Sequence, residues 1–249
     1  MNSLVEWIAA DWPAPDGVIA GCSVRQGGVS QGRYASLNLA AHVADDEAAV
    51  LENRRRFKAH CGLPAEPRWL SQVHGTKVAV EPDPGSLKSA DAAFTSKPDV
   101  VCAVLTADCL PVLFTTADGG ELAAAHAGWR GLNAGVIEAT VSEFSVSPGS
   151  LLVWLGPAIS QTAFEVGSEV RAAFIANDAA AADCFVENQR GRWQADLYAL
   201  ARQRLARAGI TQVFGGNFCT YTEPGRFFSY RRDGECGRMA SFIYAARKP

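Results

Sequence analysis

Three consecutive apolar runs constrain the fold more than any other feature of this sequence. They are VVCAVLT (100–106), LPVLFTT (110–116) and ELAAAHA (121–127), and a turn at residues 118–120 joins the last two. A strand with one face in water alternates apolar and polar residues, whereas a strand covered on both faces is apolar almost throughout. The chain is therefore expected to build sheets that are buried between other layers.

The remaining segments mix helical and extended patterns. Residues 45–60 favour a helix, because acidic residues open the segment, basic residues close it, and Gly62 and Pro64 follow. Further helices are expected at about 132–144, 168–176 and 194–208, and further strands at 68–73, 77–81, 151–156, 210–214 and 240–244. This order is neither a regular βαβ alternation nor an all-β series, so we expect a mixed α+β fold.

The composition narrows the class of protein. With 249 residues, 48% of them hydrophobic and 20% charged, the chain is typical of a globular protein, and we expect one domain spanning 1–249. The formal net charge of −3 implies no broad basic surface, so nucleic acid is not expected as the main partner. No apolar run approaches the roughly 20 residues that span a bilayer, so no membrane partner is expected either.

The cysteines indicate the redox environment. The chain has seven, scattered and without a CxxC pair. The N-terminal segment has neither a basic region nor an uninterrupted apolar core, as a signal peptide would. Both features favour free thiols in a reducing compartment, so we expect a cytoplasmic protein.

Three of the candidate reactive groups lie where predicted strands end. His74 follows WLSQV, Cys109 lies between two buried runs, and His126 ends ELAAA. Taken singly, a histidine at a strand end or a cysteine in a core is more often structural than functional. Together, two neutral imidazoles and one thiolate are ligands that suit zinc and leave a fourth position for water or substrate.

Several longer motifs carry a resemblance that covers nearly the whole chain in order. SQVHGTKV (71–78), TADCLPVLF (106–114), AHAGWRG (125–131) and GPAIS (156–160) resemble the motifs of the YfiH family, also described as polyphenol oxidase or laccase-domain proteins and as purine nucleoside phosphorylases. Further matches are SVRQGGVSQGRYASLNLAAHVADD (23–46), ENRRR (52–56) and SYRRDGECGRMA (229–240).

The resemblance implies a fold, a metal site and an activity. The family fold packs mixed β-sheets face to face and flanks them with helices. In the family, the His, Cys and His of the three central motifs bind one metal, usually zinc, which makes His74, Cys109 and His126 the metal ligands and catalytic residues here. The implied activity is phosphorolysis of adenosine, inosine and S-methyl-5'-thioadenosine, accompanied by adenosine deamination, with purine nucleoside and phosphate as substrates.

Arg130 is the fourth predicted catalytic residue, expected to hold phosphate beside the metal. Gly128 and Gly131 let the backbone approach a ligand closely, and a helix expected to start near Gly131 would offer free N–H groups to phosphate. Asp108 is a candidate proton carrier, although a strand neighbour of Cys109 would point to the other face. The predicted substrate-binding residues are Arg25, Asn38, Gln72 and Arg231, with Tyr230 beside them.

Three alternatives stay open at this point. Two histidines and one cysteine also describe a blue-copper site, so a copper-dependent polyphenol oxidase is one alternative. Its usual axial methionine would have to be Met1 or Met239, and neither lies near a ligand motif. A second alternative is an amide hydrolase that uses Cys109 as nucleophile, for example on a cell-wall precursor. A third is a nucleotide-binding protein whose metal is purely structural.

Overall fold

Two stacked β-sheets form the centre of the protein. The computed structural model describes residues 6–83 and 87–247. The first sheet has four strands, all antiparallel, in the order β1-β2-β15-β7. Its strands are β1 (Trp7–Ala9), β2 (Val18–Ser23), β15 (Met239–Ala245) and β7 (Cys102–Thr106).

The second sheet is mixed and has six strands in the order β14-β10-β8-β9-β6-β4. The outer pairs β10–β14 and β4–β6 are parallel, and the inner pairs are antiparallel. Its strands are β14 (Gln212–Gly215), β10 (Leu151–Leu155), β8 (Leu110–Thr116), β9 (Leu122–Ala127), β6 (Ala92–Thr95) and β4 (Val78–Val80). All three long apolar runs thus lie in the two central sheets.

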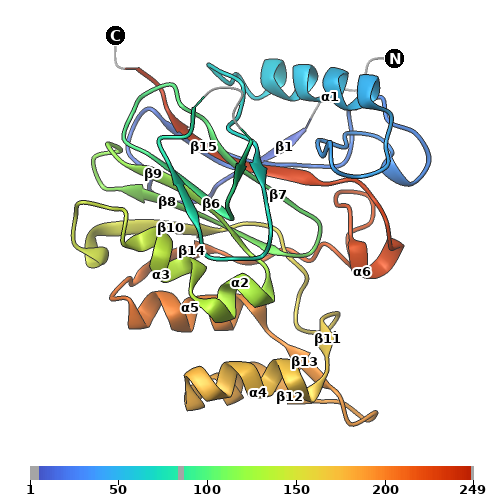
Figure 1. The fold of residues 1–249 in the computed structure, drawn as a ribbon, viewed down its shortest axis with the longest axis vertical. Coiled ribbons are helices and arrows are strands. Elements are labelled where there is room, and N and C mark those ends of the chain that lie inside the picture. Colours follow the sequence, from blue (N-terminus) through green and yellow to red (C-terminus); the bar gives the residue numbers. More distant parts are fainter. Residues whose placement is uncertain (1–5, 84–86, 248–249) are drawn as a thin grey trace.

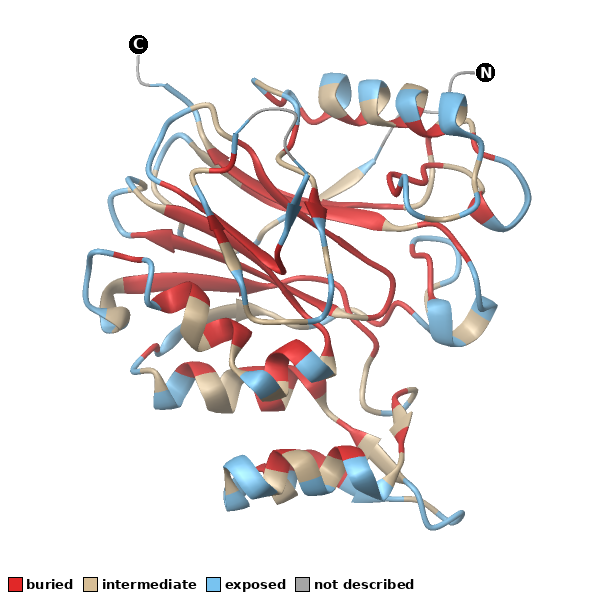
Figure 2. Cartoon of the chain, viewed as in Figure 1, coloured by how far each residue is buried: buried red, intermediate tan, exposed pale blue. Residues whose placement is uncertain are grey.

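Side-chain alternation explains why these strands are apolar throughout. In β7, Val104 packs between the sheets, while its neighbour Leu105 packs outward against a second cluster. In β9, Ala123 and Ala125 face the helices, while Ala124 faces the other sheet. Both faces of each strand are therefore dry, as the runs predicted (Figure 2).

Helices cover the two outer faces of the stack (Figure 1). Helix α1 (Glu47–His60) lies on the four-stranded sheet, with Phe57 against Phe242 at a centroid distance of 5.4 Å. Helices α2 (Trp129–Ala134), α3 (Val136–Val141) and α5 (Leu197–Arg207) cover the six-stranded sheet. This arrangement is the predicted mixed α+β fold with face-to-face sheets and flanking helices.

The remaining elements lie at the periphery. Strands β3 (Leu70–Ser71) and β5 (Lys88–Ser89) pair in parallel. Helix α4 (Ser168–Asn177) packs with the antiparallel sheet β11-β13-β12 in a lobe that projects from the helical layer (Figure 1). The strands of this lobe are β11 (Glu165–Val166), β12 (Phe185–Glu187) and β13 (Trp193–Ala195), and a short helix α6 (Tyr230–Asp233) precedes β15.

The structure corrects several predicted bounds. The helix expected at 132–144 begins at Trp129 and is divided into α2 and α3 by Gly135, whose φ of 106° breaks the helical path. The helix expected at 194–208 begins only at Leu197, because Asp196 caps it and the preceding residues form β13. Among the described residues, no helix is both long and apolar enough to cross a bilayer.

Candidate metal centre

His74, Cys109 and His126 meet at one edge of the six-stranded sheet. Cys109 directly precedes β8, and His126 is the fifth residue of β9. The antiparallel register places Pro111 opposite His126, so the start of β8 lies beside the end of β9. His74 arrives from the loop between β3 and β4. The fold thus brings together three residues that are far apart in the sequence.

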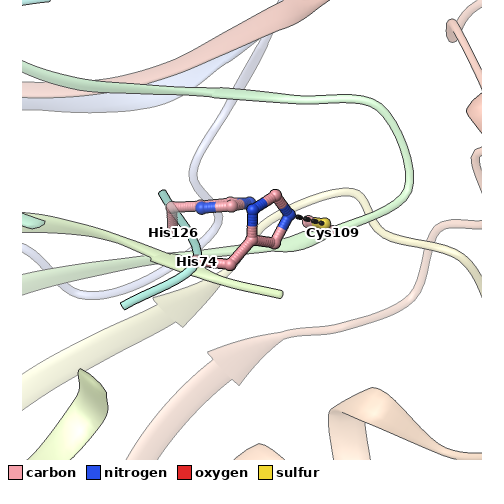
Figure 3. A group of neighbouring side chains, drawn as sticks. All are labelled: His74, Cys109 and His126. Atoms are coloured by element: carbon pink, nitrogen blue, oxygen red, sulfur yellow. Dashed lines mark hydrogen bonds between the residues drawn. The ribbon is translucent and has the colours of Figure 1, made fainter. Parts of the chain in front are cut away.

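The three side chains are close enough to share one ion (Figure 3). One ligand atom from each lies within 4.8 Å of the others. The Cys109 Sγ lies 4.0 Å from His74 Nε2, and the two imidazole rings meet edge to face with centroids 4.8 Å apart. His126 is buried, Cys109 is half-buried and His74 is exposed, so the cluster has a closed side and an open side.

Asp91 holds both histidines in place. Its carboxylate is fully buried and accepts hydrogen bonds from the backbone N–H groups of Val73 (3.1 Å), His74 (2.9 Å) and Gly75 (2.7 Å). It also lies 2.8 Å from Nδ1 of His126. This contact fixes the ring so that Nε2 is the nitrogen free for a metal, the usual arrangement behind a ligating histidine.

Sequence reasoning missed Asp91. It stands in the stretch SADAAF, where an acidic residue is flanked by alanines that are fully buried. A buried carboxylate must find several hydrogen-bond donors. The signal was therefore the single charge within an apolar segment.

Gly128 leaves the space that the ligands occupy. A Cβ at this position would lie 3.0 Å from Cys109 Sγ, 3.0 Å from His74 Cδ2 and 3.5 Å from His126 Nε2. The backbone at Gly128 is extended, with φ −61° and ψ 156°, so the requirement is for space and not for a left-handed conformation. Gly128 therefore packs directly against the three ligand side chains, where a larger residue would not fit.

The electrostatics of the cluster favour a thiolate. Burial alone would raise the pKa of Cys109, but the neighbouring His126 and His74 outweigh it and lower the pKa to about 6. Burial would likewise lower the pKa of His126, but the Cys109 thiolate and Asp91 raise it to about 9. In the metal-free protein these pKa values give a thiolate beside an imidazolium. The thiolate is the state that a metal requires of a cysteine ligand, and His126 would release its proton when a metal binds.

These observations fit a zinc-type site. The donor set is two imidazole nitrogens and one sulfur, the backing carboxylate is present, and the missing Cβ at Gly128 leaves room around the donors. Three protein ligands leave a fourth position open, which is typical of a catalytic site. The residues therefore suit a metal that also contacts substrate.

A cavity of about 420 Å³ opens beside the cluster. This volume lies in the range of small-molecule sites. One part of its wall is apolar and aromatic, and another part carries arginines. Besides the three ligands, it is lined by His42, Gln72, Leu105, Thr106, Ala107, Asp108, Trp129, Ile159, Phe164, Leu197, Tyr230, Arg231 and Arg238.

Four of the predicted polar residues line this cavity: Gln72, Asp108, Tyr230 and Arg231. Three of them are also tied to the protein by hydrogen bonds. The Gln72 amide exchanges two hydrogen bonds with the backbone of Leu105, at 2.8 and 2.7 Å. The Arg231 guanidinium donates to the Glu165 carbonyl at 2.8 Å. Asp108 accepts from the Thr220 hydroxyl at 2.6 Å and from the Arg231 backbone N–H at 2.7 Å.

The other predicted residues lie outside the lining. Arg25 donates to the Ala35 and Pro224 carbonyls. Asn38 is fully buried and makes its hydrogen bonds within the protein. Arg130 is exposed, and its guanidinium lies 4.4 Å from the centroid of Trp129. A role for these three side chains in substrate binding stays a prediction.

The cavity also contains residues that sequence reasoning did not select. His42 and Arg238 lie in segments that matched the family motifs, but nothing in their local sequence distinguished them from surface residues. Trp129 and Phe164 provide aromatic surface. They come from α2 and from the loop before β11, and only the folded chain brings these together.

Comparison with known proteins places the chain in a family. A family model described as multi-copper polyphenol oxidoreductase laccase matches residues 19–246. The chain belongs to this family. Its similarity to the purine nucleoside phosphorylase YfiH of Escherichia coli strain K12 is 56% identity over 238 residues, covering 95% of this chain and 98% of the relative. A purine nucleoside phosphorylase of Pseudomonas aeruginosa is 54% identical over 239 residues, covering 96% and 98%.

Solved structures of the same family share the fold. A protein from Neisseria meningitidis superimposes with a TM-score of 0.93 at 48% identity, covering 97% of this chain and 99% of that one. YlmD from Geobacillus stearothermophilus superimposes with a TM-score of 0.87 at 29% identity, covering 97% and 96%. These matches confirm the resemblance to the YfiH family and its mixed α+β fold. The family is one of enzymes, and the relatives from Escherichia coli and Pseudomonas aeruginosa carry the name of a purine nucleoside phosphorylase.

Proposed function

We propose that this chain is a zinc-dependent purine nucleoside phosphorylase acting on adenosine, inosine and S-methyl-5'-thioadenosine. The observation that carries the proposal is the open His-Cys-His cluster at the wall of a cavity that also contains aromatic surface and two arginines. The names of the relatives support the same activity.

The reaction needs three things from the site. An oxygen of hydrogen phosphate forms a bond to C1' of the ribose, while the bond from C1' to N9 of the purine breaks. The electron pair of that bond leaves with the purine, which takes up the proton that the phosphate carried, and ribose 1-phosphate remains. The site must therefore hold the anion, hold the nucleoside beside it, and exclude competing water.

The residues of the cavity can supply these functions. When bound, zinc supplies a Lewis acid that polarises an oxygen atom and acidifies bound water. Trp129 and Phe164 offer flat apolar surface to the purine, and Ile159 and Leu197 keep the wall beside them dry. Arg231 and Arg238 supply positive charge for the phosphate.

Adenosine deamination would use the same metal but also needs a carboxylate that moves protons. Asp108 is the carboxylate among the described lining residues, and both of its oxygens accept hydrogen bonds from the chain. Because both Asp108 oxygens are occupied by these hydrogen bonds, the site favours phosphorolysis as the main reaction and deamination as a side activity.

A second candidate function rests on a specific contact. Cys109, His126 and Asp91 follow one another as thiol, imidazole and carboxylate, and the pKa of Cys109 is lowered to about 6, with burial opposing this shift and His126 causing it. That is the arrangement of a cysteine nucleophile with its base and orienting acid. An amide hydrolase would use it without metal.

The copper alternative receives less support from the fold. Met239 is fully buried, and its sulfur accepts a hydrogen bond from the Phe228 backbone N–H at 3.1 Å. The axial thioether of a blue-copper site is therefore not offered by this residue. The same three ligands could also bind copper, so the copper content of the purified protein should be measured.

One experiment separates these functions. Purified protein is analysed for bound metal and assayed with inosine and adenosine, with and without phosphate, before and after chelation and after zinc or copper is restored. Release of base that requires phosphate and zinc supports the proposal. Release of ammonia without phosphate supports deamination, and oxidation of a phenol only after copper loading supports the oxidase. Amide cleavage that survives chelation but not thiol alkylation would replace the phosphorylase by the hydrolase.

A further inference from the structure

The two arginines that line the cavity have no carboxylate partner. Neither the Arg231 nor the Arg238 guanidinium forms an ion pair with a described residue. The nearby carboxylate of Asp108 is taken by the Thr220 hydroxyl and by the backbone N–H of Arg231. The two guanidinium groups therefore line the cavity without an ion pair of their own, although a half-buried charge such as that of Arg238 is normally paired.

A second cavity shows the contrast. A hollow of about 550 Å³ beside α5 also holds two arginines. There Arg204 pairs with Glu138 at 2.8 Å, and Arg207 pairs with Asp178 at 2.9 Å. In that hollow both arginines are matched by acids, whereas neither guanidinium beside the metal cluster has an acidic partner among the described residues.

Arg238 is fixed by its own loop and keeps part of its fork free. Its Nη1 donates to the carbonyls of Cys236 (2.7 Å) and Gly237 (3.0 Å). Its Nε and Nη2 have no hydrogen-bond acceptor in the part of the chain that the structure describes. A half-buried guanidinium that is held at Nη1 and free at Nε and Nη2 can donate in parallel to two oxygens of an anion.

Asn38 joins Arg238 to the loop that carries His42. The Asn38 Oδ1 accepts from the backbone N–H of Arg238 at 3.0 Å and from that of Ala40 at 3.0 Å. Its Nδ2 donates to Asp45 at 2.8 Å. Burial and the neighbouring Arg238 both lower the pKa of His42, so its imidazole is neutral near pH 7 and can offer an N–H beside the Arg238 charge.

We propose that Arg238 and His42 form an oxyanion subsite that holds the phosphate co-substrate, with Asn38 as the positioning residue. This inference rests on the proposed function and deepens it. It moves the phosphate from Arg130, whose exposed guanidinium lies over Trp129, to the wall that Arg238 and His42 share. A nucleoside monophosphate would offer the same oxygens, and the test separates the two sources.

The test begins with binding, which does not depend on turnover. Zinc-loaded wild-type protein is titrated with inorganic phosphate by calorimetry and compared with Arg238→Gln, Arg238→Lys and Arg130→Ala. Arg238→Gln removes the charge but retains a donor for the loop carbonyls, and thermal unfolding confirms that it folds. Loss of a charge-assisted contact is expected to weaken phosphate binding about 10- to 100-fold, with partial rescue in the lysine variant.

A matched control is available at the surface. Arg33 forms an exposed ion pair with Glu235 at 3.0 Å and does not line the cavity, so Arg33→Gln should bind phosphate as the wild type does. In the phosphorolysis assay, Arg238→Gln should raise the KM for phosphate while the KM for inosine stays within about twofold. Asn38→Ala should give a smaller change in the same direction.

Three results would overturn the subsite. One is phosphate affinity that is unchanged in Arg238→Gln or that falls only in Arg130→Ala. Another is wild-type protein that binds no phosphate. The third is Arg238-dependent binding of adenosine monophosphate but not of inorganic phosphate, which would assign the oxygens to a nucleotide. If the wild type binds phosphate through Arg238 but releases no base, the proposed reaction fails while the subsite stands.

Discussion

Replacing Asp91 by asparagine tests the organisation of the metal centre most directly. The carboxylate accepts three backbone N–H bonds from residues 73–75 and contacts His126 Nδ1. Asparagine has nearly the same shape but only one acceptor oxygen, and its amide would face N–H groups that also donate. About two of the four contacts would be lost inside the protein.

The expected effect follows from those two contacts. Each charge-assisted hydrogen bond contributes about 1.5 to 3 kcal/mol, so the free energy of unfolding of the metal-free protein should fall by about 3 kcal/mol or more. Because His126 and His74 would lose their fixed orientation, the affinity for zinc should fall about 10- to 100-fold. Denaturant unfolding and competition with a chelator measure these two quantities separately.

The pH dependence gives a further check on Asp91. Burial would raise its pKa, but His126 and the backbone N–H groups outweigh it, so the native pKa lies below the ordinary value. The contribution of Asp91 to stability is therefore complete above about pH 4 and is lost as the pH falls through the lower native pKa. Asp91→Asn should flatten this acid limb, whereas exposed Asp83→Asn should not. Wild-type zinc affinity and an unchanged acid limb in Asp91→Asn would refute the reasoning.

Two other perturbations address the space and the charge of the cluster. In Gly128→Ala, the new Cβ would lie 3.0 Å from Cys109 Sγ and from His74 Cδ2. The affinity for zinc should therefore fall about tenfold or more while the fold is kept, which competition with a chelator measures. Unchanged zinc affinity would show that the ligands can move aside. In metal-free protein, the rate of Cys109 alkylation should increase as the pH rises through about 6, because the effect of His126 on the thiol pKa outweighs the burial that opposes ionisation. Cys109→Ser should lose this reactive phase. A midpoint of the rate profile near the ordinary thiol pKa of about 8.5 would contradict the interaction between Cys109 and His126.

The layers of the fold could be predicted because burial acts on every residue of a strand. In β9, alternate side chains face the helices and the other sheet, so nothing but apolar residues fits most positions. His126 departs from this rule on the face that it shares with Leu122 and Ala124, and that departure marked it as a site residue. The ligand set itself came from the family motifs and not from spacing.

The missed features depend on partners that are distant in the sequence. Strand 68–73 shortens to Leu70–Ser71, because the N–H groups of residues 73–75 turn to Asp91 instead of a neighbouring strand. The helix expected at 132–144 breaks at Gly135, where a left-handed conformation that glycine adopts easily is used in the middle of the segment. The sequence around Arg238 is that of a surface residue, and only the structure shows that Asn38 accepts a hydrogen bond from its backbone N–H and joins it to the loop of His42.

His74 helps to choose between the metal enzyme and the metal-free hydrolase. A hydrolase needs Cys109, His126 and Asp91, and the two contacts that join these residues are complete without a second imidazole. Yet His74 is held beside them with a φ of 60°, a left-handed conformation that costs a residue with a side chain about 1 kcal/mol or more. Asp91 stabilises this turn with three N–H contacts. A metal ion uses the third donor that this turn presents, so the conformation of His74 favours the metal enzyme.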